Sequence, residues 1–286
     1  MNFAFDIPTI LLGEADEAVF AAARGTPHPP ANSLGNPREG IPRGTLRRGR
    51  HVHRNMWDEI ARDWAVYVPA QYGATRPANL IVFQDGRNYL ERTGAVAVLD
   101  NLIGAGELAP TIALFVQPGD ITAQPPGNQS VRSLEYDSMT DAYVTYLLEE
   151  LMPIALEGLN VTNDPAKRAI CGMSSGGICA FNAAWLRPDQ FGLVISHVGS
   201  FTALRGGNAF PSIVRQNARK PIRVFLQAGA GDIVNSVDHW PLASIQMALA
   251  LAYKEYDVRL EFGLGAHNFE HAAAILPQTL KWIFRA

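Results

Sequence analysis

Short apolar runs alternate with helix-like segments along most of the chain, and this alternation constrains the fold more than any other feature. Runs of this length are typical of strands buried on both faces of a parallel sheet whose crossovers are helical. The sequence therefore predicts an α/β fold with a mostly parallel central sheet of about eight strands. The predicted strands span residues 45–52, 64–68, 80–83, 111–116, 168–172, 193–196, 222–226 and 258–262, and the predicted helices span 94–104, 138–151, 176–185, 241–254 and 277–284.

The alternation continues to the C-terminus without a linker, so we predict one domain over residues 45–286. Residues 25–44 hold five prolines and four glycines, a composition that sustains neither a helix nor a central strand. A short helix is expected before them, at 14–23. Residues 1–44 are predicted to form an N-terminal arm. The arm is either a connector into the domain or a segment that covers the rim of a site or a partner subunit, which would give a homodimer.

Charge and composition exclude several classes of protein. With 24 Lys and Arg against 27 Asp and Glu, the net charge of −3 does not favour nucleic-acid binding. The one basic run, at 43–54, carries five arginines without interleaved aromatic residues and is interpreted as a solvated strand face. No stretch approaches the roughly 20 apolar residues of a membrane span. The first residues lack the basic region of a signal peptide, so a cytoplasmic location is expected; the alternative is an exported protein whose signal has been removed.

The chain has two cysteines, Cys171 and Cys179. They are too few for a disulfide scaffold, and their spacing is not that of metal ligands. Their apolar surroundings predict buried free thiols, with a single disulfide between them as the alternative.

The sequence GMSSG at residues 172–176 is the sharpest local signal. It follows a predicted strand and precedes a predicted helix. A G-x-S-x-G motif in that context places its serine at the apex of a sharp turn, with the hydroxyl exposed at the carboxyl edge of the sheet. Ser174 has glycine two residues away on both sides, whereas Ser175 has Met173 at −2. We therefore predict Ser174 as a nucleophile; the alternative is an ordinary glycine-rich turn.

A serine nucleophile needs a base to take its proton and a carboxylate to orient that base. In folds built around such a turn, the acid and then the histidine follow the serine, each beyond a later strand. Asp232 ends the glycine-rich segment after strand 222–226, and His267 ends the one after strand 258–262. These positions predict Asp232 as the acid and His267 as the base.

Other residues compete for these roles. Asp232 could simply cap a turn, and Asp238 is the second choice for the acid. Asp257 and Glu261 fit less well because they lie before or within the following strand. His271 is the nearest rival of His267, and the two could form a metal pair at i and i+4. The H-E-x-x-H pattern is absent, however, and we predict no metal or cofactor.

An oxyanion hole needs two backbone N–H groups. The residue after the nucleophile, Ser175, supplies one, and the loop after strand 80–83 supplies the other through Arg87, unless Asp85-Gly86 is an ordinary turn. Arg87, Arg132 and Arg205 are candidates to face an anionic group, although surface arginines are common. Trp240 is either a pocket wall or a core residue.

With these residues in place, the chain resembles the esterase D-like group of α/β-hydrolases over residues 40–286. This group includes enterochelin esterases, feruloyl and acetylxylan esterases and mycolyltransferases. The resemblance implies an α/β-hydrolase fold with Ser174 as nucleophile, Asp232 as acid and His267 as base, the amides of Arg87 and Ser175 as oxyanion hole, and no cofactor. The resemblance rests on VYVPAQY at 66–72, FQDGRNYL at 83–90, SLEYD at 133–137, RAICGMSSGG at 168–177, RPDQFG at 187–192, HVGSF at 197–201, FLQAGAGD at 225–232 and GLGAHNFEHAAAILPQTLKWIF at 263–284.

The expected function is that of a serine carboxylic-ester hydrolase that forms an acyl-enzyme with a small-molecule or polymer-derived ester. Acyl transfer to an alcohol, or hydrolysis of an amide- or ester-linked polymer, would use the same three side chains. A hydrolase fold retained as a binding module is a third hypothesis, and the intact series of Ser, Asp and His argues against it.

Overall fold

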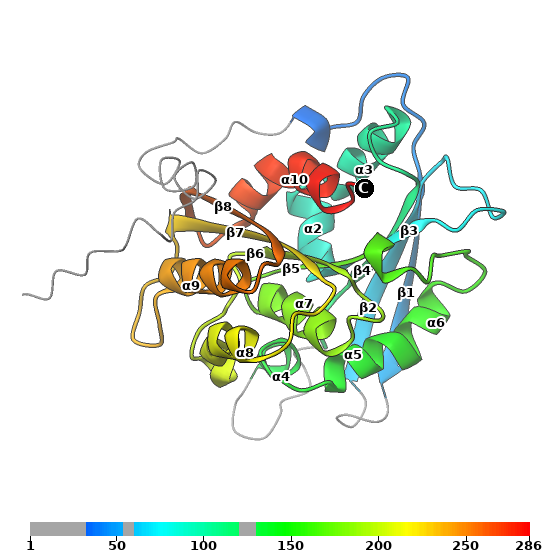
Figure 1. Ribbon diagram of the computed structural model, residues 1–286. Helices are drawn as coiled ribbons and strands as arrows, with labels where there is room; N and C mark the ends of the chain where they lie inside the picture. Colours follow the sequence, from blue (N-terminus) through cyan, green and yellow to red (C-terminus); the bar gives the residue numbers. More distant parts are fainter. Residues whose placement is uncertain (1–32, 54–59, 120–129) are drawn as a thin grey trace, which may run out of the picture.

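An eight-stranded sheet with the order β1-β2-β4-β3-β5-β6-β7-β8 forms the centre of the molecule (Figure 1). The computed structural model describes residues 33–53, 60–119 and 130–286. Strands β3 to β8 are parallel, while β2 pairs antiparallel with both β4 and β1. The predicted α/β-hydrolase architecture, with a mostly parallel sheet flanked by helices, is confirmed.

The elements follow the predicted alternation of strand and helix. The strands are β1 (Thr45–His53), β2 (Ile60–Val68), β3 (Asn79–Gln84), β4 (Thr111–Val116), β5 (Arg168–Met173), β6 (Leu193–His197), β7 (Arg223–Gly231) and β8 (Asp257–Ala266). The α-helices are α2 (Gly86–Arg92), α3 (Ala95–Gly104), α4 (Val131–Tyr136), α5 (Ala142–Tyr146), α6 (Met152–Ala155), α7 (Ser175–Leu186), α8 (Phe210–Gln216), α9 (Trp240–Tyr253) and α10 (Phe269–Ile283). Shorter turns are η2 (Ser33–Gly35), η3 (Leu147–Leu151), η4 (Pro165–Lys167) and η5 (Leu204–Ala209).

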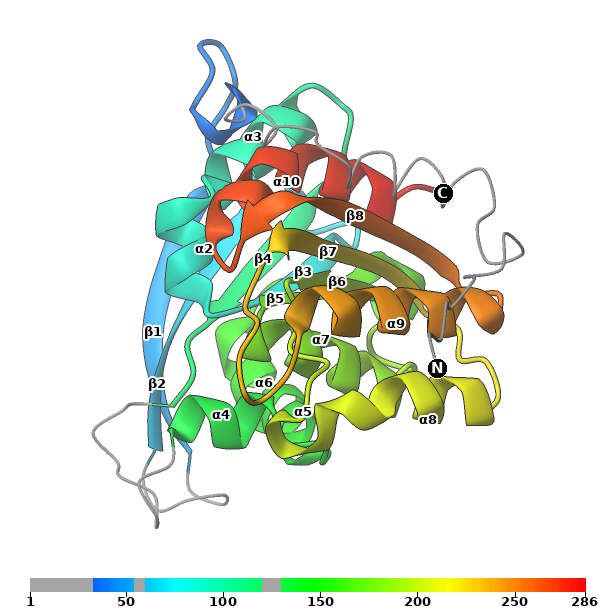
Figure 2. The same cartoon turned by 90° about the vertical axis from the view of Figure 1, so that its left-hand side faces the viewer.

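Two apolar layers sandwich the sheet because successive strand residues point to opposite faces. On β3, Ile81 and Phe83 pack under α2, α3 and α10, whereas Leu80 and Val82 pack against the layer that contains α7 and α9. Figures 1 and 2 show α2, α3 and α10 on one face and α4 to α9 on the other. The inner strands are therefore buried on both faces and mostly apolar, which is the pattern that the sequence presented.

The glycine-rich segments beyond residues 226 and 262 differ from prediction, because they extend β7 and β8 rather than forming loops. Gly229 pairs with Gly263, and the register shifts before Gly231 pairs with Ala266. A Cβ on Gly229 would lie only 2.1 Å from the carbonyl oxygen of Gly265. Glycine at these positions therefore allows the two strands to approach closely. The extended strands also determine where the residues that follow them lie.

Two predicted helices also have different bounds. The last helix begins at Phe269 rather than at Pro277, with the side chain of Asn268 accepting a hydrogen bond from the Glu270 N–H at 3.0 Å. Pro277 lies inside it, and burial of Leu276 and Leu280 offsets the missing N–H donor. The predicted helix 138–151 begins later, at Ala142, is divided into α5 and the π-helical turn η3, and continues beyond residue 151 as α6. A π-turn leaves no mark in apolar periodicity.

Part of the predicted arm lies against α3. The Asn101 side chain donates hydrogen bonds to the carbonyls of Leu34 (2.8 Å) and Asn36 (2.9 Å). The N–H of Gly44 donates to Asp100 at 2.8 Å. Residues 1–32, with the helix predicted at 14–23, lie outside the described residues. The arm as a separate unit and the homodimer stay predictions.

Both cysteines are buried and free, as predicted. Burial raises the pKa of Cys171 and of Cys179 above the ordinary thiol range. Within the described part of the chain, no helix has the length and apolar character needed to span a membrane.

Candidate active site

Ser174 lies at the apex of a tight turn between β5 and α7, with φ 60° and ψ −121°. This positive φ is strained for a serine. The turn can be this tight because residue 172 is glycine. A Cβ on Gly172 would lie only 2.1 Å from the carbonyl oxygen of Gly176. The Ser174 N–H donates to the carbonyl of His197 at 2.9 Å, which fixes the turn to β6. The serine hydroxyl thus stands at the carboxyl edge of the parallel strands.

Ser174, His267 and Asp232 form one chain of hydrogen bonds. His267 Nε2 is 2.8 Å from Ser174 Oγ, and His267 Nδ1 is 2.5 Å from Asp232 Oδ1. Asp232 directly follows β7, and its side chain is fully buried. His267 directly follows β8, and 19% of its side chain is exposed. The arrangement matches a nucleophile, a base and an orienting carboxylate in series.

Two further polar side chains adjoin Ser174. The hydroxyl of Ser200 is 3.3 Å from Ser174 Oγ, and the indole N–H of Trp240 donates to Ser200 Oγ at 3.1 Å. The Trp240 ring meets the His267 ring edge-on, with centroids 6.1 Å apart. Trp240 is thus buried and next to His267, and its role as a pocket wall stays a prediction. Sequence reasoning missed Ser200, although its place just after β6 is where parallel-sheet sites collect residues.

The two predicted oxyanion amides open two helices. Ser175 is the first residue of α7, and Arg87 is the second residue of α2. First-turn amides have no acceptor within their own helix and stay available to another acceptor. The loop before α2 borders the serine turn, since a Cβ on Gly176 would lie 2.9 Å from Asp85 Oδ2. Asp85 itself is left-handed, with φ 53° and ψ 43°.

Arg132 joins this loop to the serine turn. Its Nε and one terminal nitrogen each donate to a carboxylate oxygen of Asp85 at 2.7 Å, and that nitrogen also lies 3.2 Å from the carbonyl of Met173. Burial acts to lower the pKa of Arg132, but the hydrogen bonds and charge of Asp85 raise it overall. An anionic group near Arg132, as the sequence analysis considered, would have to compete with this ion pair. The sequence carries no local signal for the pair.

A second buried carboxylate, Asp137, interacts with Ser175, the residue after Ser174. Burial raises its pKa, while hydrogen bonds from Ser133 and Ser175 and the charges of Arg132 and Arg205 act in the opposite direction. Arg205 is an exposed residue of η5 with φ 46°. Of the three candidate arginines, Arg205 and Arg132 thus interact electrostatically with buried carboxylates near the serine turn.

The rival residues have other partners. Asp238 accepts hydrogen bonds from the N–H groups of Ala203 (2.9 Å) and His239 (2.8 Å). His271 is buried, with Nδ1 3.1 Å from the side-chain nitrogen of Gln227. Asp257 and Glu261 pair with arginines, at 2.6 Å from Arg223 and 2.8 Å from Arg259 respectively. Over residues 33–53, 60–119 and 130–286, no group of three or more His, Cys, Asp or Glu residues could hold a metal ion.

Solved structures with the same fold were found among esterases. A ferulic acid esterase superposes with a TM-score of 0.68 at 18% identity, covering 85% of this chain and 99% of the other. The enterobactin esterase FES from Shigella flexneri gives a TM-score of 0.72 at 18% identity, covering 90% of this chain and 63% of the other. At such identities the likeness establishes the fold alone.

Sequence comparisons add the family. The iron(III) enterobactin esterase of Dickeya dadantii (strain 3937) is 32% identical over 128 residues, which are 45% of this chain and 27% of that protein. The uncharacterized protein YbbA of Bacillus subtilis (strain 168) is 24% identical over 145 residues, which are 49% of this chain and 57% of that protein. The chain thus matches only part of each relative's length. The profile of the family described as "Putative esterase" matches residues 59–280. The chain belongs to this Putative esterase family.

Proposed function

We propose that this protein is a serine esterase that hydrolyses carboxylic esters through an acyl-enzyme on Ser174. The observation that carries the proposal is the unbroken series of hydrogen bonds from Asp232 through His267 to Ser174, at 2.5 and 2.8 Å. Membership of an esterase family and similarity to enterobactin and ferulic acid esterases support ester hydrolysis. The geometry supports serine as the nucleophile, because no other hydroxyl in the described chain contacts His267.

In the proposed reaction, His267 Nε2 takes the proton of Ser174 as the hydroxyl oxygen attacks the ester carbonyl carbon. The carbonyl oxygen becomes an oxyanion, which accepts hydrogen bonds from the N–H groups of Ser175 and Arg87. His267 then gives its proton to the departing alcohol, which leaves an acyl group on Ser174. Water repeats the steps with His267 as base and releases the acid. Asp232 accepts the hydrogen bond of His267 Nδ1–H throughout and so keeps Nε2 aimed at the serine.

The direct test replaces Ser174 with alanine. We expect Ser174→Ala to lose hydrolysis of 4-nitrophenyl acetate by at least about 10³-fold, because removal of the nucleophile leaves only the oxyanion donors and binding. It should also lose covalent labelling by a fluorophosphonate probe, with an unchanged circular dichroism spectrum. Ser33→Ala, which alters an exposed serine of η2, the turn that packs on α3, is the matched control and should behave as wild type.

Each alternative function gives a different result in the same assays. A binding module would leave the wild-type protein unlabelled and inactive. An acyltransferase would form the ester of an added alcohol faster than it releases acid. Full activity of Ser174→Ala would contradict the proposed nucleophile. Because the similar structures are ferulic acid and enterobactin esterases, methyl ferulate belongs in the substrate screen beside acetyl and butyryl esters.

A further inference from the structure

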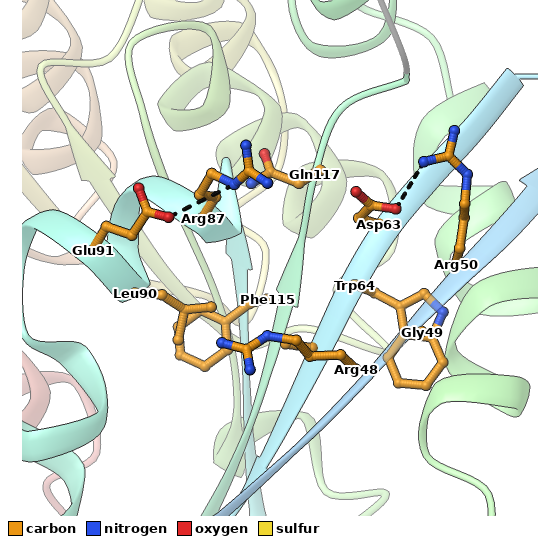
Figure 3. Close-up of a pocket in the computed structure, with 11 residues that line it drawn as sticks. Arg48, Gly49, Arg50, Asp63, Trp64, Arg87, Leu90, Glu91, Phe115 and Gln117 are labelled. Atoms are coloured by element: carbon orange, nitrogen blue, oxygen red, sulfur yellow. Dashed lines mark hydrogen bonds and ion pairs between the residues drawn. The ribbon is translucent and has the colours of Figure 1, made fainter.

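A pocket of about 580 Å³ opens at the carboxyl edge of the sheet, between strands β1 and β2 and helix α2 (Figure 3). This volume accommodates a ring-sized group. No residue of the Ser174 hydrogen-bond series lines the pocket, but Arg87 does. The lining residues are Arg48, Gly49, Arg50, Asp63, Trp64, Ala65, Arg87, Leu90, Glu91, Phe115 and Gln117.

Strand register explains how β1 contributes two arginines. Arg48 is opposite Ala65, and Arg50 is opposite Asp63, in the β1–β2 ladder. Ala65 is in turn opposite Phe115 of β4. Residues directly opposite one another in a sheet point to the same face. Both arginines therefore lie on the face that α2 covers, where Phe115 is buried and stacks on Phe83 with ring centroids 4.9 Å apart.

The charges of the pocket do not balance. Arg50 pairs with Asp63 at 3.0 Å, and Arg87 pairs with Glu91 at 3.7 Å. Arg48 makes no hydrogen bond or ion pair to the residues that the structure describes, and its side chain extends from β1 toward Leu90 and Phe115 (Figure 3). Among the lining residues that the structure describes, three guanidinium groups thus face two carboxylates around an apolar floor, and Arg48 is the arginine without a partner.

The two existing ion pairs can rearrange. More than half of each side chain is exposed in both pairs, with values from 53% to 70%. Exposed pairs of this kind contribute little to stability, so their guanidinium groups can turn to a bound anion at small cost. A guanidinium binds a carboxylate in two-pronged fashion, and the apolar floor would accept the body of the group that carries it.

The pocket also adjoins the proposed reaction centre. Arg87 supplies a proposed oxyanion N–H from its backbone, while its side chain lines the pocket. Asp85, two residues earlier, borders the serine turn at Gly176. The pocket and the proposed oxyanion N–H thus share one residue, Arg87, and the proposal requires an ester bound at that N–H to extend along the Arg87 side chain.

We propose that this pocket, which we call the β1–α2 pocket, binds an anionic, ring-sized part of the ester substrate, with Arg48 as its main specificity-determining residue. The proposal rests on the proposed esterase function and adds a preference for negatively charged esters. The negative charge could be on the acid part or on the alcohol part of the ester. A carboxylate on either part would form the same ion pair with Arg48.

Pairs of esters of which one carries a carboxylate and the other does not test the proposal. 4-Acetoxybenzoate against methyl 4-acetoxybenzoate places the carboxylate on the alcohol side, and methyl 4-carboxybenzoate against methyl benzoate places it on the acid side. The measured quantity is the ratio of kcat/KM for the anionic ester to that for the neutral one. We expect wild type to give a ratio above one for at least one pair, and this ratio to fall as salt rises from about 0.01 M to 1 M.

Substitution of Arg48 should lower that ratio selectively. We expect a fall of about three- to tenfold in Arg48→Gln and a larger fall in Arg48→Glu, since a partly exposed ion pair contributes on this scale. Arg43→Gln is the matched control, because it removes the same charge from an exposed arginine five residues earlier, roughly 16 Å along the extended chain. Its ratio should equal that of wild type.

The outcomes separate the pocket from the proposed function. If neutral esters are hydrolysed through Ser174 but the ratio is the same in wild type and Arg48→Glu, the pocket proposal is wrong and the esterase function stands. An equal fall in Arg43→Gln would also overturn it, since the effect would then come from general charge. Loss of all hydrolysis in wild type would instead contradict the proposed function.

Discussion

The guanidinium of Arg132 joins two segments that the proposed reaction needs side by side. It binds both carboxylate oxygens of Asp85, two residues before Arg87, and reaches the Met173 carbonyl, one residue before Ser174. Asp85 has the left-handed conformation, which costs about 1–3 kcal/mol for a residue other than glycine. A two-pronged ion pair that is largely buried offsets this cost and holds Arg87 N–H in place.

We predict that Arg132→Met lowers kcat for 4-nitrophenyl acetate by about 10- to 100-fold, less than the ~10²–10³ lost on deletion of an oxyanion donor. KM should change little, because the N–H groups act mainly on the transition state. Arg132→Lys keeps the charge without the two-pronged geometry and should lose less. Steady-state kinetics with a thermal melt of each variant provides the measurement. An unchanged kcat in a folded Arg132→Met protein would show that the loop holds its position without Arg132.

At the scale of elements, the sequence predicts those features that depend on a single strand or helix. Each inner strand is a local apolar run, and Ser174, Asp232 and His267 each follow directly on a strand, so their order along the chain predicts their gathering at one edge. Contacts between elements carry no such signal. Arg132 and Asp85 are 47 residues apart, and their pairing depends on how α4 packs against α7 and so reaches the residue before α2.

Element ends were predicted less well where glycine or proline has an uncommon role. Gly229 and Gly263 pair across β7 and β8, although glycine-rich sequence usually indicates a loop. Pro277 lies inside α10, although proline usually marks a helix boundary. In both cases burial and close packing, which a single sequence does not display, outweigh the local preference.

A buried ion pair connects β2 to α4. Arg62 and Glu135 form a hydrogen-bonded pair with no exposed side-chain surface, and Glu135 also accepts the N–H of Gly119 at 3.0 Å. The guanidinium of Arg62 lies 4.2 Å from the centroid of the Tyr146 ring. Burial acts to lower the pKa of Arg62, and the Glu135 charge raises it overall, so the arginine stays charged at all physiological pH values. Each charge thus depends on the other.

We predict that Glu135→Leu lowers the free energy of unfolding by about 3–5 kcal/mol, because it leaves Arg62 charged and unpaired in the interior. The double variant Arg62→Met/Glu135→Leu should recover a large part of that loss, since it removes both charges and fills similar volume. Urea unfolding of the two single variants and the double variant measures the coupling. Additive losses in the double variant would contradict mutual dependence of the pair.

At the scale of the whole molecule, the parallel sheet acts as the frame of the site. Strands β5, β7 and β8 all end at one edge, and the residues that follow them meet there although they are up to 93 residues apart in sequence. The antiparallel strands β1 and β2 extend the same edge and supply the arginines of the β1–α2 pocket. One sheet edge therefore holds both the hydrogen-bond series and the pocket that we propose to select its substrate.

The interior of this frame contains a histidine that couples stability to pH. His197 of β6 is fully buried, with Nδ1 2.8 Å from the hydroxyl of Tyr89. Burial, with a smaller contribution from the charge of His271, lowers its pKa from 6.5 to about 3. Between these two pH values the unfolded chain binds a proton that the folded chain does not. Folded stability is therefore lost as pH falls from about 6.5, by up to about 1.4 kcal/mol per pH unit for this group.

We predict that His197→Gln makes the free energy of unfolding less dependent on pH between about 6.5 and 5, a window in which few carboxylates titrate. Glutamine keeps a polar partner for Tyr89 but cannot take up the proton. Urea unfolding at several pH values gives the slope, and slopes rather than absolute stabilities are compared because the substitution also alters packing. If wild type and His197→Gln lose stability equally steeply in this window, the proton uptake that destabilises the fold occurs elsewhere in the molecule.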